Sequence, residues 1–125
     1  MLRLTQLKLI LSRNPDAGFP EGDDRYGYVI FVPLNHEGLI DRDQWRAHRA
    51  HCKVIRFSPD AQANADGLLS HRDGKWHIHY DENDEGPDEA FDHLSDHRLF
   101  IGDYVTITSP IGNDLVYQVI ENRDA

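Results

Sequence analysis

Residues 68–80, LLSHRDGKWHIHY, decide the fold. Two runs of alternating apolar and polar residues flank the dipeptide Asp73-Gly74. Asp-Gly is a favoured pair for the two-residue type I′ turn that joins neighbouring antiparallel strands. We therefore predict a β-hairpin over this stretch, with His71 opposite Trp76 and Ser70 opposite His77.

The register of this hairpin divides its side chains between two faces, because side chains alternate along a strand. One face is apolar and is expected to join the core; it carries Leu69, His71, Trp76, Ile78 and Tyr80. The other is mostly polar and carries Leu68, Ser70, Arg72, Lys75, His77 and His79. His71 is therefore predicted to point away from the other two histidines.

Strand-like patterns continue on both sides of the hairpin. Apolar alternation over residues 2–11 changes parity near Thr5-Gln6, which a β-bulge in this strand would explain. Residues 26–32 are aromatic and β-branched and end at Pro33. Further strands are predicted at residues 53–57, 97–101, 104–108 and 115–120.

One helix interrupts this pattern. Asp41 stands three residues before Gln44, a capping-box arrangement that predicts a short surface helix over residues 42–51, docked by Trp45. The whole chain, residues 1–125, is then a single, mainly β domain of about seven strands, arranged as an antiparallel barrel or sandwich.

The charge of the chain narrows its choice of partners. The formal net charge is −9, and seven acidic residues without a basic one fall within residues 81–92, which we expect to form a loop. The remainder of the chain carries only −2. Such a protein repels nucleic acid and anionic membrane surfaces, so we expect neither as a partner.

The cysteine content and the hydropathy pattern predict a cytoplasmic protein. Cys52 is the only cysteine, so no intrachain disulfide is expected and a reducing compartment fits. The longest apolar run, residues 28–34, is far too short to cross a bilayer. The oligomeric state is left open by the sequence.

A histidine pair suggests a zinc-type metal site. His77 and His79 share a strand face about 6.6 Å apart, close enough to bind one ion. Asp81 lies about 13 Å from His77 along an extended strand, so a third ligand would have to come from His93 or His97. The alternative is a pair of histidines that face solvent on a polar strand.

The acidic loop suggests a calcium site instead. Oxygen ligands at alternate positions with a glycine at the sixth resemble an EF-hand loop. The ligands would be Asp81, Asn83, Glu85, Glu89 and Asp92. Pro87 at the seventh position and Asp92 at the last depart from the EF-hand pattern. The alternatives are a solvated loop, or a loop that contacts a basic protein partner through Asp84, Glu85, Asp88 and Glu89.

No catalytic residue is predicted. The chain has no nucleophile elbow, phosphate loop or dinucleotide fingerprint. His48 lies one helical turn before Cys52, but the thiol would sit at the C-terminal end of the helix, where the helix dipole opposes a thiolate. We therefore expect Cys52 to be buried and structural, and an enzyme is the less favoured class.

Two resemblances accompany these patterns. Residues 100–107 with 117–119 resemble the closing hairpin of SH3-like barrels. A longer series is similar to a group of uncharacterised small proteobacterial proteins, which implies a stable bacterial cytosolic domain of unassigned activity. It comprises Gly27-Tyr28, Val32-Pro33-Leu34, Asp41 with Trp45, Cys52 with Arg56-Phe57, Gly67, Leu69 and His71, Trp76 with His79-Tyr80-Asp81, and His97-Arg98 with Gly102-Asp103-Tyr104-Val105.

These observations predict a non-enzymatic binding or accessory domain that contacts another protein. The alternative is a divalent-metal-binding protein that uses the histidine pair or the acidic loop.

Overall fold

The computed structural model describes residues 3–59, 65–72, 75–80, 89–92, 98–108 and 114–125. Its strands are β1 (Thr5–Leu11), β2 (Asp23–Val32), β3 (Lys53–Phe57), β4 (Ala65–Arg72), β5 (Lys75–Tyr80), β6 (Glu89–Asp92), β7 (Tyr104–Thr108) and β8 (Asp114–Asp124). The helical elements are η1 (Pro15–Ala17), α1 (Arg42–Ala47) and η2 (Arg49–His51).

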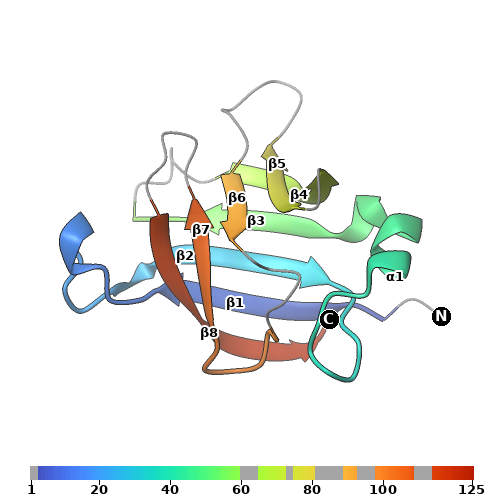
Figure 1. The fold of residues 1–125 in the computed structure, drawn as a ribbon, viewed down its shortest axis with the longest axis horizontal. Helices are drawn as coiled ribbons and strands as arrows, with labels where there is room; N and C mark the ends of the chain where they lie inside the picture. Colours follow the sequence, from blue (N-terminus) through green and yellow to red (C-terminus); the bar gives the residue numbers. More distant parts are fainter. Residues whose placement is uncertain (1–2, 60–64, 73–74, 81–88, 93–97, 109–113) are drawn as a thin grey trace.

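The strands form one closed barrel in chain order. Each strand pairs antiparallel with the next, and β8 pairs with β1 to close the sheet. Figure 1 shows β1 and β8 side by side, with η1 at one end of the molecule and α1 at the other. Every described strand therefore has a paired neighbour on both sides. The predicted mainly β fold is confirmed, as a barrel rather than a sandwich.

The central hairpin is confirmed in its register. His71 pairs with Trp76 and Ser70 with His77 across β4 and β5. Leu69, Trp76 and Ile78 are buried, as the prediction for the core face requires. The turn residues 73–74 lie outside the described residues.

The predicted bulge in the first strand is wrong in its position. Leu7, Leu9 and Leu11 are all buried, so β1 alternates without interruption. The register shifts instead where Lys8 pairs with Glu121 but Leu9 pairs with Val119. The extra residue therefore belongs to β8, and a second shift against β2 follows Ile10.

Two predictions near the acidic segment are also wrong. Residues 98–101 are not a strand, because the Asp103 carboxylate accepts a hydrogen bond from the Phe100 N–H at 3.0 Å and closes a turn there. The expected loop 81–92 ends in a strand, β6. Phe91 is buried and pairs with Ile107 of β7, so one aromatic side chain secures this strand among acidic neighbours.

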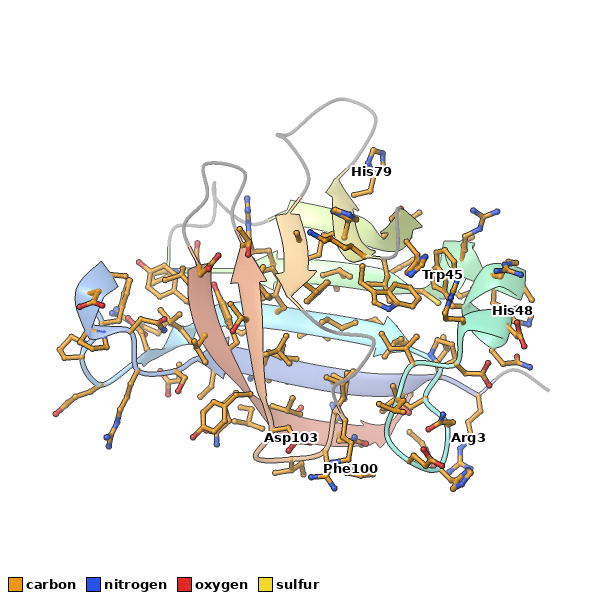
Figure 2. The ribbon with its side chains drawn as sticks, viewed as in Figure 1. Arg3, Trp45, His48, His79, Phe100 and Asp103 are labelled. Atoms are coloured by element: carbon orange, nitrogen blue, oxygen red, sulfur yellow. The ribbon has the colours of Figure 1, made fainter. Side chains whose placement is uncertain are left out.

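The predicted helix is present in two pieces. The Asp41 carboxylate accepts the Gln44 N–H at 3.1 Å and caps α1, which ends at Ala47; η2 completes the segment. Figure 2 shows Trp45 pointing from α1 toward the barrel. Its indole N–H donates to the Leu69 carbonyl at 2.9 Å, which fixes the helix on β4.

Candidate functional site

Polar side chains occupy inward positions of the barrel where β3 ends, away from α1 and η2. Val54 of β3 is fully buried opposite Ile30. The next position of the same parity is Arg56, which pairs with the buried Tyr28 of β2 and is itself half-buried. Since paired residues of antiparallel strands share a face, Arg56 points inward at this end of the barrel.

A cavity of about 390 Å³ opens at this position. Its lining residues are Tyr26, Gly27, Tyr28, Arg56, Phe57, Ser58 and Tyr117. We call it the barrel-end pocket. The rings of Tyr28 and Tyr117 meet edge to face, 5.1 Å apart at 71°, and only 2% and 6% of these residues is exposed. The two tyrosines therefore form a closely packed wall of the barrel-end pocket.

Gly27 is required for the shape of this pocket. A Cβ atom at this position would collide with the carbonyl oxygen of Leu9 and would lie 2.8 Å from Cζ of Phe57. The aromatic ring of Phe57 therefore packs against bare backbone. The Lys8 ammonium stands 5.7 Å from the centre of the Phe57 ring.

The lining of the barrel-end pocket is mostly aromatic, with one guanidinium and one serine. Among the described residues that line the pocket, none is histidine, cysteine, aspartate or glutamate, the side chains that usually move protons or attack substrates. The guanidinium of Arg56 carries five N–H donors in a planar fork, and the serine and tyrosines add hydroxyl groups.

A larger hollow of about 640 Å³ beside η1 has a different character. Its buried polar residue is Asn14, whose side chain donates to the carbonyls of Ser12 and Val116 at 2.8 and 3.0 Å. The Asn14 side-chain oxygen accepts the Val116 N–H at 2.9 Å. These hydrogen bonds hold the η1 loop against β8, so the role of the Asn14 side chain is structural.

Three exposed apolar side chains lie at or next to the turn before β7. Phe100, Ile101 and Tyr104 are 40%, 66% and 54% exposed, and we call them the Phe100 surface. Figure 2 shows Phe100 beside Asp103 at the outer edge of the molecule. The turn is held by hydrogen bonds from Gly102 N–H to the Val119 carbonyl at 2.8 Å and from Val119 N–H to the Asp103 carbonyl at 2.9 Å.

The two histidines proposed for zinc lie on the outer face of β5, as predicted. His77 is half-buried and His79 is exposed, and Figure 2 shows His79 directed away from the barrel. His93 and His97 lie outside the described residues. Within the described ranges, no group of three histidine, cysteine, aspartate or glutamate side chains is placed to hold a metal ion. The zinc site stays a prediction, which elemental analysis would test.

Most of the acidic segment lies outside the described residues. This holds for Asp81, Asn83, Asp84, Glu85 and Asp88. The backbones of Glu89 and Asp92 are extended within β6. The calcium site and the acidic partner-binding site both stay predictions.

His71 lies on the core face beside two tryptophans. Its ring centre is 4.7 Å from that of Trp76 and 6.1 Å from that of Trp45. Burial lowers the pKa of His71, and the nearby charges of Arg42, His77 and Arg46 lower it further. The neutral imidazole is therefore favoured, and its role is packing.

Cys52 is buried, as predicted. Its Sγ donates to the His48 carbonyl at 3.5 Å, and burial raises the pKa of the thiol to about 11. A neutral thiol is a weak nucleophile, so the placement of Cys52 opposes a catalytic role.

Sequence reasoning missed the barrel-end pocket. The available signal was Arg56, a charged residue at the same strand parity as Val54. The contribution of Tyr117 depends on the pairing of β8 with β1, which no local pattern reveals.

Comparison with known proteins does not extend these observations. No protein-family model matches the chain. Neither the curated proteins nor the solved structures contain a significant match. The resemblance to small proteobacterial proteins therefore stays a prediction. Over the described residues, the longest helix falls well short of what a membrane crossing needs.

Proposed function

We propose that this protein is a non-catalytic binding domain that contacts another protein through the Phe100 surface. One observation carries the proposal: three large apolar side chains are exposed within five residues, at a turn that hydrogen bonds hold in place and at the first residue of β7. Isolated exposed apolar residues are ordinary, whereas a contiguous group of them is typical of an interaction site.

The rigidity of the turn strengthens this argument. The Asp103 carboxylate bonds the Phe100 N–H, and Asn122 donates from its side chain to the Leu99 carbonyl at 2.6 Å. A surface that is already ordered loses little conformational entropy when a partner binds. Aromatic residues near the centre of an interface also contribute disproportionately to affinity.

The charge of the chain favours a different protein over a second copy. Two copies, each with a net charge of −9, repel one another. A partner with an apolar groove and a basic rim is complementary. The acidic residues Asp84, Glu85, Asp88 and Glu89 are part of this proposal, since they would attract such a partner from a distance.

The experiment is crosslinking followed by affinity purification from the native cell, with Ile101→Asn/Tyr104→Ser as the test variant. We expect the variant to lose the partners that the unchanged protein recovers. Leu68→Ser, which removes an exposed apolar side chain elsewhere, should keep them. Recovery of the same partners by the test variant would contradict the proposal. Sedimentation velocity of the purified chain should show a monomer; a dimer abolished by Ile101→Asn would identify a second copy as the occupant.

A separate variant tests the acidic segment. Neutralising Asp84, Glu85, Asp88 and Glu89 to their amides should weaken partner recovery most at low salt, where long-range attraction is least screened. Unchanged recovery at every salt concentration would remove the acidic segment from the proposal.

A further inference from the structure

Three arginines form an exposed basic surface on the segment of α1 and η2. Arg42 and Arg46 stand about one helical turn apart on α1, and the guanidinium of Arg49 in η2 lies 5.6 Å from the ring centre of Trp45. All three arginines are exposed, and we call them the arginine face. Figure 2 shows His48, which separates α1 from η2, at the outer edge of the molecule.

The charge of this segment is opposite to that of the rest of the chain. Residues 42–53 carry a formal charge of +3, because Lys53 joins the three arginines and Asp43 is the only acid, and the other residues carry −12. No carboxylate of the described residues forms an ion pair with the arginine face, whereas Arg3 and Arg25 each pair with an aspartate. The guanidinium groups of the arginine face are therefore open to an anion from outside.

A purely structural role does not explain these charges. Arg42 is the first residue of α1, where the helix dipole favours an acid and disfavours a cation. Arg42 and Arg46 also repel one another, because like charges four residues apart destabilise a helix. Burial lowers the pKa of His71, and the charges of the same two arginines lower it further. An anion bound to the arginine face would relieve this repulsion.

The geometry of the guanidinium groups suits carboxylates. Each guanidinium presents a planar fork of donors that can bind a carboxylate at two points. Arg49 lies over the ring of Trp45, and an arginine that contacts an aromatic ring keeps its edge donors for such a bond. The same contact restricts the Arg49 side chain, so less conformational entropy is lost on binding.

The surroundings favour an acidic protein segment over nucleic acid. Proteins that bind single strands commonly stack bases on aromatic side chains, but Trp45 is 5% exposed and residues 42–53 hold no other tryptophan, tyrosine or phenylalanine. A duplex would extend past the arginine face and meet the repulsion of a remainder that carries −12. A short acidic segment contacts the arginine face alone.

We propose that the arginine face binds a segment of a partner protein that is rich in aspartate and glutamate. Figure 1 shows α1, which carries two of the three arginines, at the end of the molecule opposite η1. The arginine face shares no residue with the Phe100 surface, so this contact goes beyond the one proposed there.

Calorimetry and ¹⁵N-NMR titration with two probes test the proposal on the unchanged protein. An octapeptide of alternating glutamate and glycine presents the carboxylates, and the same peptide with glutamine carries none. We expect the glutamate peptide to bind about tenfold more tightly, to shift the backbone signals of Arg42, Arg46 and Arg49, and to lose its advantage as salt is added. Equal affinities, or shifts confined to other parts of the chain, would overturn the proposal. Tighter binding of a single-stranded oligothymidylate of equal charge would also overturn it, in favour of nucleic acid.

The variant Arg42→Gln/Arg46→Gln locates the recognition. It should abolish the preference for the glutamate peptide, while its melting temperature stays the same or rises because the repulsion is removed. Arg13→Gln/Arg25→Gln is the matched control: it changes the net charge equally, at exposed positions on either side of η1 in the sequence, and should keep the preference. A preference that survives in the first variant, or that the control loses to the same extent, would overturn the assignment.

Discussion

The indole ring of Trp45 stands edge-on against that of Trp76, with ring centres 5.0 Å apart and planes at 83°. Trp45 comes from α1 and Trp76 from β5, so the contact joins the helix to the barrel. The two indole N–H groups differ. That of Trp45 donates to Leu69, whereas that of Trp76 is buried without a hydrogen-bond partner within the described part of the chain.

This difference predicts unequal effects of the same substitution. Trp45→Phe and Trp76→Phe remove the same atoms from buried positions, but only the first removes a hydrogen bond. A typical hydrogen bond contributes about 1 kcal/mol, so Trp45→Phe should lower the free energy of unfolding by about 1 kcal/mol more than Trp76→Phe. Urea denaturation measures both. Equal losses would contradict the structural role assigned to the Trp45 hydrogen bond.

The hairpin of β4 and β5 was predictable because its determinants are local. An Asp-Gly pair between alternating runs specifies the turn, and the turn specifies the register. β6 was not predictable in this way, because its two apolar residues stand among acids and its hydrogen bonds come from β5 and β7. At residues 98–101, the bond from Phe100 to the Asp103 carboxylate outweighs an alternating pattern that resembles a strand.

The candidate site was less predictable than the fold. Arg56 could be recognised as a charged residue at an inward position only after the direction of β3 was known. The aromatic walls combine residues of β2, β3 and β8, which meet because the barrel closes between its first and last strands. The pairing of the first strand with the last cannot be predicted from the pattern of neighbouring residues alone.

Gly27 should tolerate no side chain. A Cβ atom there meets the backbone of Leu9, which cannot move without disturbing the pairing of β1 with β2. Gly27→Ala should therefore lower the free energy of unfolding by about 3 kcal/mol. Gly18→Ala is the matched control: its φ of +89° is strained for alanine, but its surroundings are open, so about 1 kcal/mol is expected. Thermal or urea unfolding that ranks Gly18→Ala as the more damaging change would contradict this packing.

His71 should make the stability depend on pH. Because burial, Arg42, His77 and Arg46 lower the pKa of His71 in the folded protein, the unfolded chain binds the proton more readily. The stabilisation is fully present above the unfolded pKa of about 6.5 and is lost as the pH falls through the lower folded pKa. NMR titration of the His71 ring should show this lowered pKa, and Arg46→Gln should raise it. A His71 pKa that Arg46→Gln leaves unchanged would contradict the electrostatic part of this account.

The His71 contribution can also be isolated by stability measurements. His71→Gln should flatten the fall in unfolding free energy between pH 8 and pH 5, whereas His36→Gln, at a position 91% exposed in its side chain, should leave that fall intact. Identical pH profiles for the two variants would show that other groups dominate the acid response.

Cys52 should react with thiol reagents only after unfolding. Burial raises the pKa of its thiol from 9.0 to about 11, so near pH 8 the folded protein holds about a hundredfold less thiolate than an ordinary cysteine does. Labelling by a chromogenic disulfide should therefore be at least about a hundredfold slower in buffer than in concentrated urea. Ala47→Cys in a Cys52→Ser background places a thiol at an exposed position of α1 and should react at an ordinary rate in both solvents. The Cys52 backbone is hydrogen-bonded to Arg49 of η2 and to Leu69 of β4, and its thiol is buried. Rapid labelling of the folded, unsubstituted protein would therefore contradict the burial of Cys52.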